Sequence, residues 1–340
     1  MLTSRQLLIL HAIVDDYVRS AEPVGSRSIS KREDISFSSA TIRNDMADLE
    51  ELGFLEKPHS SAGRIPSQLG YRYYVDHLLM PQNLTIKEKA TIRSLFTERV
   101  QEMEDVIQLS ARILSNMTSY ISIVLGPEVF DSKLKNIQII PLSDVSAILI
   151  LVTDTGHVEN QTIAIPSNMV GEDIQIIVNI LNERLVGVPL YQLAKKIKTE
   201  VSEVMNHHLR NSNQVLSVIS RTLELEKQDK VFYSGKMNLL NQPEFRDLDK
   251  VRVILDILEQ DHIMNQVVRG KENGLQIKIG HENKHEAFDN CSMITASYTV
   301  AGKHMGTIGI IGPTRMEYRR VIGVVDTISE NLTYFLNKLY

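Results

Sequence analysis

The sequence has one cysteine, no long hydrophobic run and no basic leader. Because a lone cysteine, Cys291, cannot form an intramolecular disulfide, the chain fits a reducing compartment. No apolar stretch approaches the roughly 18 residues that a membrane-spanning helix needs. The N-terminal residues MLTSRQLLIL also lack the basic region and the apolar core of a signal peptide. We therefore expect a cytoplasmic protein with no membrane partner.

An excess of positive charge is also missing. The chain carries 37 Lys and Arg residues against 42 Asp and Glu residues, a net charge of −5, and its first 80 residues hold nine basic and eleven acidic side chains, a net charge of −2. Proteins that bind nucleic acid mainly through counterion release are usually basic. If this chain binds DNA, it must use a local patch and read base edges. The candidate patch consists of Arg27, Lys31, Arg43, Lys57, Arg64 and Arg72.

Enzyme motifs are scarce as well. The sequence contains no glycine-rich phosphate loop and no G-x-S-x-G motif. Residues His281 to His285 match H-E-x-x-H, the zinc-protease signature, which requires both histidines on one helical face. This stretch directly follows a predicted strand, and Lys284 would place a positive charge beside the metal, so a surface loop is favoured over a zinc enzyme. We expect no catalytic activity, metal or cofactor, and a packing role for Cys291.

The most informative stretch is residues 37–72, which predicts a helix, a hairpin and the start of another helix. Ser38 or Ser39 can cap a helix over residues 40–52, and Gly53 ends it. Apolar residues recur at i, i+4 and i+7 and predict the buried face of this helix: Ile42, Met46 and Leu49.

The opposite face of the helix suits the major groove of DNA. Its first turns offer small residues together with Thr41, Arg43 and Asn44, and Arg and Asn can bond guanine and adenine edges through two hydrogen bonds. We assign base readout to these three residues and phosphate contacts to Ser38 and Ser39. The far end carries acidic residues that phosphates would repel, Asp48, Glu50 and Glu51. We therefore expect the N-terminus of the helix to point into the groove.

The hairpin that follows predicts the wing of a winged helix-turn-helix. Residues 54–57 and 64–67 are the expected strands, and residues 58–63 form a turn-rich loop. Its expected phosphate or minor-groove contacts are Lys57, His59, Ser60, Ser61 and Arg64. The alternative is an ordinary amphipathic helix followed by a surface hairpin.

Further helices complete the N-terminal unit. We expect helices over residues 4–20, from Ser26 to Lys31 or Arg32, and over residues 71–79, with a short strand in the break at residues 22–26. Three tyrosines of the last helix should serve packing, because duplex DNA rarely needs stacking platforms: Tyr71, Tyr73 and Tyr74.

Beyond residue 80, helix and strand patterns alternate, which favours an α+β fold. Thr85 and Glu88 form a capping box that opens a long helix ending near Tyr120. The expected strands are residues 121–125, 134–141, 146–152, 157–165, 231–233, 275–279, 292–300 and 304–312. The expected helices are residues 170–185, 190–197, 199–228, 248–268 and 317–339.

Long motifs at both ends of the chain resemble the HrcA family of bacterial heat-inducible transcription repressors. The resemblance is carried by LTSRQLLILHAIVDDYV, EPVGSRSI, SSATIRNDMADLEELGFLEKPHSSAGRIPS, GYRYYVDHLL and, at residues 306–332, GTIGIIGPTRMEYRRVIGVVDTISENL. Ser60 and Ser67 stand where threonine is expected, and both keep the hydroxyl.

The resemblance implies a homodimeric repressor of chaperone operons. Such a protein binds double-stranded DNA at an inverted repeat called CIRCE, and the chaperonin GroEL favours its active form. The implied architecture is a winged helix at residues 1–80, a GAF-like α/β domain at residues 81–168 and 245–340, and an inserted helix-rich dimerisation domain at residues 169–244. An alternative is a metabolite-responsive regulator that binds its effector in the GAF-like domain.

Overall fold

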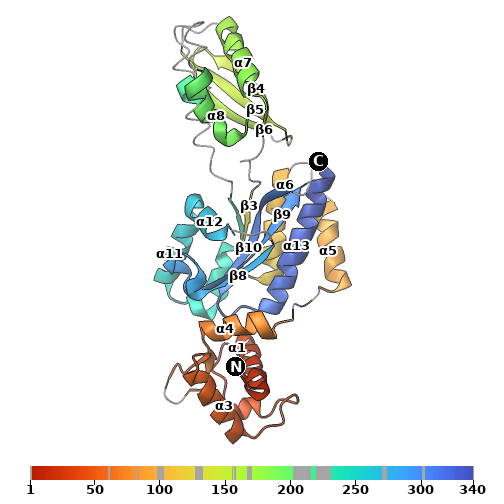
Figure 1. Cartoon of the computed structure of the whole chain (residues 1–340), viewed down its shortest axis with the longest axis vertical. Helices are drawn as coiled ribbons and strands as arrows, with labels where there is room; N and C mark the ends of the chain where they lie inside the picture. Colours follow the sequence, from red (N-terminus) through yellow and green to blue (C-terminus); the bar gives the residue numbers. More distant parts are fainter. Residues whose placement is uncertain are drawn as a thin grey trace. The chain divides into compact units, whose positions relative to one another are not determined.

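The chain folds with mixed helices and sheets, as an α+β protein (Figure 1). The computed structural model describes residues 2–59, 62–80, 82, 84–97, 103–126, 133–154, 156, 158–166, 171–201, 216–219, 231–269, 274–300 and 303–339. Two compact units are present: one combines residues 1–126 with residues 231–337, and the other combines residues 127–230 with residues 338–340. In the described part of the chain, no helix is long and apolar enough to cross a membrane.

The N-terminal segment, residues 2–80, begins the first unit with helices and one hairpin. Its elements are α1 (Ser4–Ser20), α2 (Ser26–Ile29), α3 (Ser39–Glu51), β1 (Leu55–Glu56), β2 (Ile65–Pro66), α4 (Gln68–Tyr73) and the π-helix η1 (Tyr74–Leu78). β1 and β2 pair antiparallel, and Val24 adds a β-bridge to Arg64. The first helices and the hairpin lie where the sequence predicts them, and Val24 lies in the break where a short strand is expected. The helix predicted over residues 71–79 begins earlier, at Gln68, and continues as the π-helix η1.

Local signals explain where these helices begin and end. Thr3 and Gln6 form a capping box at the start of α1, and Ala21 ends this helix in the left-handed conformation with φ 56°. Ser38 caps α3 by accepting a hydrogen bond from the Thr41 N–H. Gly53, with φ +81°, follows the C-cap of α3, a conformation that glycine adopts without the strain of a side chain.

The centre of the first unit is an antiparallel sheet with the strand order β7-β3-β10-β9-β8. The strands are β3 (Ile121–Leu125), β7 (Val231–Ser234), β8 (Leu275–Ile279), β9 (Cys291–Val300) and β10 (Lys303–Pro313). The sequence predicts a strand at residues 231–233 within the insertion. β7 instead pairs with β3 over residues 231–234 and 122–125, so it belongs to this sheet.

Helices cover both faces of this five-stranded sheet. One face packs on α5 (Ile86–Thr97), α6 (Met103–Thr118) and α13 (Tyr318–Leu339), and the other on α11 (Leu248–Leu258) and α12 (Asp261–Val268). The capping box of Thr85 and Glu88 is present at the start of α5. The sequence predicts one helix over residues 248–268, whereas the structure has α11 and α12. Short 3-10 turns connect these elements: η4 (Lys236–Asn241), η5 (Pro243–Phe245), η6 (Gly280–Glu282) and η7 (Glu286–Phe288).

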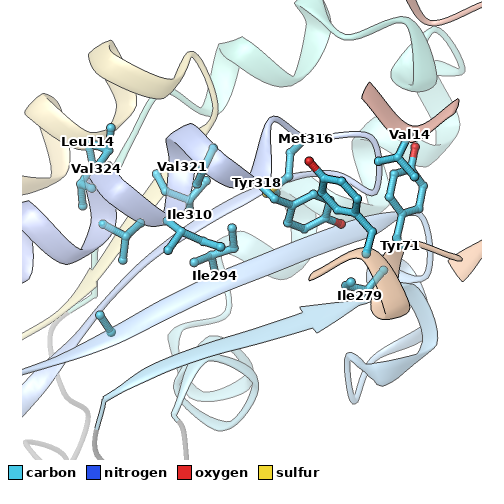
Figure 2. Packing of buried hydrophobic residues seen from close by; sticks show 14 of the residues in the cluster. Val14, Tyr71, Leu114, Ile279, Ile294, Ile310, Met316, Tyr318, Val321 and Val324 are labelled. Atoms are coloured by element: carbon cyan, nitrogen blue, oxygen red, sulfur yellow. The ribbon is translucent and has the colours of Figure 1, made fainter. Parts of the chain in front are cut away.

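The core of the N-terminal segment is continuous with the core beneath α13. Figure 2 shows Val14 and Tyr71 beside Met316 and Tyr318, next to Ile279. The rings of Tyr71 and Tyr318 lie 5.9 Å apart between their centroids. The N-terminal segment therefore packs against the sheet-bearing part of its unit through buried apolar side chains as well as polar contacts.

The second unit contains a three-stranded antiparallel sheet with the order β4-β5-β6. Its elements are β4 (Leu134–Ser143), β5 (Ser146–Thr153), β6 (Val158–Ala164), α7 (Gly171–Leu185), α8 (Leu190–Lys196) and the π-helix η3 (Ile197–Val201). One sheet face is buried with α7 and α8 in a separate hydrophobic core. Most of the helix predicted over residues 199–228 lies outside the described residues.

The bounds of this unit differ from those expected for the insertion. The expected insertion covers residues 169–244, whereas the compact unit covers residues 127–230 together with residues 338–340. The reason is strand pairing: among the described residues, β4, β5 and β6 pair with one another, while β7 pairs with β3 of the larger sheet. Hydrophobic patterning identifies strands but does not say which strands pair.

Candidate nucleic-acid interface

The first turns of α3 are built around the capping serine. Ser38 Oγ accepts a hydrogen bond from the Thr41 N–H at 3.2 Å and lies 2.9 Å from Thr41 Oγ1. Ser39 is oriented differently, because its Oγ lies 2.9 Å from Ser26 Oγ on α2. Ser38 therefore remains exposed at the helix start, whereas Ser39 is half-buried and connects α3 to α2.

The outer face of α3 carries the residues expected to read bases. Arg43 and Asn44 are exposed, and Ala40 and Ala47 beside them are exposed as well. Within the described residues, neither the Arg43 nor the Asn44 side chain has a hydrogen bond or an ion pair, so both can reach a ligand. The opposite face is buried as the sequence predicts, with at most 4% exposure for Ile42, Met46 and Leu49.

A charged residue, Asp45, also lies on the buried face of α3, where the sequence predicts only apolar side chains. Asp45 is 2% exposed and accepts two hydrogen bonds from Arg5 on α1, from Nε at 2.7 Å and from Nη2 at 3.1 Å. A bidentate arginine pair fixes orientation as well as distance. Arg5 and Asp45 therefore set the angle at which α1 holds α3. The sequence does contain a signal for this burial: Asp45 follows Ile42 by three residues, so both side chains lie on the same face of the helix.

The hairpin presents fewer cations than expected. Lys57 and His59 are exposed after β1. Ser60 and Ser61 lie outside the described residues. Arg64 is half-buried, and its Nη2 lies 2.6 Å from Glu50 Oε2 at the end of α3. The Arg64 guanidinium is thus held against α3, where its charge is partly neutralised.

Arg72 does not belong to the proposed basic patch. Its guanidinium binds the Glu282 carboxylate and donates to the carbonyl oxygen of Ile277 at 2.7 Å. Both partners lie in the sheet-bearing part of the unit, Ile277 in β8 and Glu282 in η6. The exposed cations that remain in the patch are Arg27, Lys31, Arg43 and Lys57.

The tyrosines of α4 and η1 serve packing, as the sequence predicts. Tyr71 is 2% exposed and Tyr74 is 4% exposed. Tyr73 is half-buried, with its ring centroid 5.3 Å from that of Phe54. These tyrosines therefore pack α4 and η1 against the rest of the unit.

The H-E-x-x-H stretch does not have the geometry of a zinc-protease site. His281 lies in η6 with its Nδ1 3.1 Å from Asp289 Oδ2, whereas His285 Nδ1 accepts a hydrogen bond from the Ala287 N–H at the start of η7. Glu282, the would-be general base, is bound to Arg72. Among the residues that the structure describes, no group of three or more His, Cys, Asp or Glu side chains could hold a metal ion.

Cys291 is a buried packing residue in β9. It is fully buried, and this burial raises the pKa of the thiol to about 12. Since the thiolate is the reactive form, we expect the folded protein to resist iodoacetamide at pH 8 and to be alkylated readily in denaturant. Mass spectrometry of both samples measures this difference. Rapid alkylation of the native protein would contradict the buried position.

Comparisons with known proteins place the whole chain among transcription repressors. A sequence model described as "HrcA protein C terminal domain" matches residues 104–322. The chain is 64% identical over 340 residues to the heat-inducible transcription repressor HrcA of Halalkalibacterium halodurans, covering 100% of this chain and 99% of that protein. The proteins of the same name from Shouchella clausii and Bacillus pumilus are 57% and 50% identical, each over at least 98% of both chains.

A solved structure also shares the fold. The crystal structure of a hypothetical protein matches with a TM-score of 0.66 and 23% identity, and the match covers 100% of both chains. This likeness concerns the fold alone.

Proposed function

Since the chain belongs to the HrcA family of heat-inducible transcription repressors, we propose that it represses chaperone operons as a homodimer bound to the CIRCE inverted repeat. The observation that carries this proposal is the outer face of α3. Arg43 and Asn44 are exposed there, while the buried face of the helix is fixed by apolar packing and by the Arg5–Asp45 pair. A rigid helix with exposed bonding groups is what base readout requires.

In this proposal residues 1–80 form a winged helix. The N-terminal turns of α3 enter the major groove, where Thr41, Arg43 and Asn44 contact base edges. Ser38 and the N-terminus of α3 approach a phosphate. Ser39 is a weaker candidate for phosphate contact, because its hydroxyl lies beside Ser26. Lys57, His59, Ser60 and Ser61 of the hairpin contact the sugar-phosphate backbone of the DNA.

An inverted repeat needs a two-fold dimer, because each half-site takes one recognition helix in an equivalent orientation. We assign a GAF-like role to the five-stranded sheet with its helices, and dimerisation to the second unit. The sheet face of this unit opposite α7 supports the assignment, since Ile140, Leu142 and Val158 are 45%, 56% and 54% exposed. Exposed apolar side chains on one sheet face are compatible with an interface.

We also propose, from the family, that temperature controls the activity of this repressor. Chaperonin GroEL would maintain the active fold in the bacterial cytosol, and heat would draw the chaperonin to other unfolded proteins. Less free chaperonin then means less active repressor and more transcription of the chaperone operons.

The direct test is fluorescence anisotropy of a labelled CIRCE-type duplex against a scrambled duplex at physiological salt, with and without chaperonin. We expect tight binding to the inverted repeat alone, strengthened by chaperonin. Equal affinity for both duplexes from a well-folded dimer would reject the operator proposal. If the affinity for the operator is the same with and without chaperonin, only the proposed control by GroEL would be rejected.

Lys57→Ala tests the hairpin. A lysine that neutralises one phosphate should contribute equally to every DNA sequence, so its loss should weaken operator and scrambled duplex alike. The plot of log K against log salt concentration should become shallower by about one unit. Lys135→Ala, an exposed lysine of β4, removes the same charge and serves as the control. An unchanged salt slope in Lys57→Ala would exclude a phosphate contact at this position.

A further inference from the structure

The N-terminal segment is joined to the rest of its unit by one covalent connection, the chain between η1 and α5. A segment with one connection keeps a fixed orientation only when non-covalent contacts hold it. Polar contacts of this kind converge on the turn that follows β8. We call them the docking contact, formed by Gln68 and Arg72 of α4 with residues 277–289.

Arg72 supplies the charged half of the docking contact. Its Nε donates to Glu282 Oε1 at 2.8 Å, its Nη2 donates to Glu282 Oε2, and Nη2 also reaches the Ile277 carbonyl oxygen. The Glu282 carboxylate is itself held by the Ile279 N–H, which donates to Oε2 at 2.8 Å. A forked pair between a guanidinium and an anchored carboxylate restricts rotation as well as separation.

Gln68 supplies the neutral half. Its Nε2 donates to the Asp289 carbonyl oxygen at 3.1 Å, and its Oε1 accepts from the His281 N–H at 3.0 Å. Gly280 allows this approach, because a Cβ at that position would lie 2.1 Å from Gln68 Cδ. Gly280 also has φ +54°, which favours glycine. The turn that carries the H-E-x-x-H stretch thus binds α4 through its backbone and through Glu282.

A second set of contacts fixes the segment near α13. Arg315 donates from Nη1 to the Val18 carbonyl oxygen at 2.7 Å, and Arg319 donates from Nε to Tyr74 Oη at 3.0 Å. Arg319 Nη2 also contacts His11 Nε2. Burial lowers the pKa of His11, so a neutral ring can accept this hydrogen bond. The N-terminal segment is therefore held at two separate places.

We propose that Gln68, Arg72 and Glu282 are positioning residues for operator recognition, which hold α3 at one orientation relative to the five-stranded sheet. This inference rests on the proposed function as a dimer on an inverted repeat. Each added base pair moves a half-site by about 3.4 Å and rotates it by about 34°. Recognition helices that are held rigidly on their sheets therefore tolerate fewer half-site spacings than loosely tethered ones.

The test compares Glu282→Gln with Glu286→Gln. Both variants remove one negative charge from the same turn, but within the described residues the Glu286 side chain has no bond to α4. Full-length dimers are titrated with duplexes whose central spacer is native, two base pairs shorter or two base pairs longer, and with a single half-site. Amide exchange at His281 reports whether the docking contact has opened.

We expect the wild type and Glu286→Gln to prefer the native spacer by about tenfold or more, and Glu282→Gln by about threefold or less, with half-site binding unchanged. Arg72→Lys keeps the positive charge but cannot form the two parallel hydrogen bonds to Glu282. We expect its spacer preference to fall as in Glu282→Gln. An unchanged spacer preference in both variants, or an equal loss on the half-site and on the operator, would overturn the positioning role alone. A wild type that ignores the inverted repeat would overturn the repressor proposal as well.

Discussion

Arg43→Ala is expected to weaken operator binding by about 1–3 kcal/mol and to relax specificity at one base pair. Arg43 is exposed on the outer face of α3, close to the capped N-terminus of the helix. An arginine there can donate two hydrogen bonds to guanine, and alanine leaves those acceptors unpaired. The measurement is anisotropy on the operator and on duplexes substituted singly at each half-site position.

The pattern across these duplexes distinguishes two roles. If Arg43 contacts a base, the affinity of Arg43→Ala should no longer depend on which base stands at that one position. Substitutions at the other positions should still lower its affinity. A phosphate contact weakens binding to all duplexes equally, which would show that the proposed orientation of α3 is wrong. Arg19→Ala, an exposed arginine in the last turn of α1, controls for the loss of one positive charge.

The second large effect concerns the fold that carries α3. Leu49→Ala should lower the free energy of unfolding by about 2–5 kcal/mol, because Leu49 is fully buried and its truncation leaves a cavity in the core. Leu52→Ala should cost less than about 0.5 kcal/mol, since Leu52 is 53% exposed at the end of the same helix. The pair compares one chemical change at a buried and an exposed site.

Circular dichroism in a urea titration measures both variants, because the chain has no tryptophan to report by fluorescence. We expect the unfolding midpoint of Leu49→Ala to fall clearly and that of Leu52→Ala to remain close to the wild type. Equal shifts would show that α3 does not pack through the Ile42–Met46–Leu49 face.

The sequence alone determined most of the local structure. The bounds of α1, β3 and β8 were predicted to the residue, and α3 to within one residue. These elements depend on caps, on apolar periodicity and on a glycine at a left-handed position, which are interactions between residues close together in the chain. The outward position of Arg43 and Asn44 follows from the same periodicity, because it needs only the helix and its buried face.

The tertiary structure decided which partners distant residues have. The sequence grouped Arg72 with DNA-facing cations. In the structure it binds the nearby Asp76 and also Glu282, which lies 210 residues further along the chain. Strand β7 was placed in the insertion, but it pairs with a strand more than a hundred residues earlier. Hydrophobic patterns give each segment its type and its buried face, whereas strand pairs and ion pairs depend on which surfaces meet when the chain folds. The family motifs therefore identified the repressor, and only the fold showed how α4 is fixed to the turn after β8.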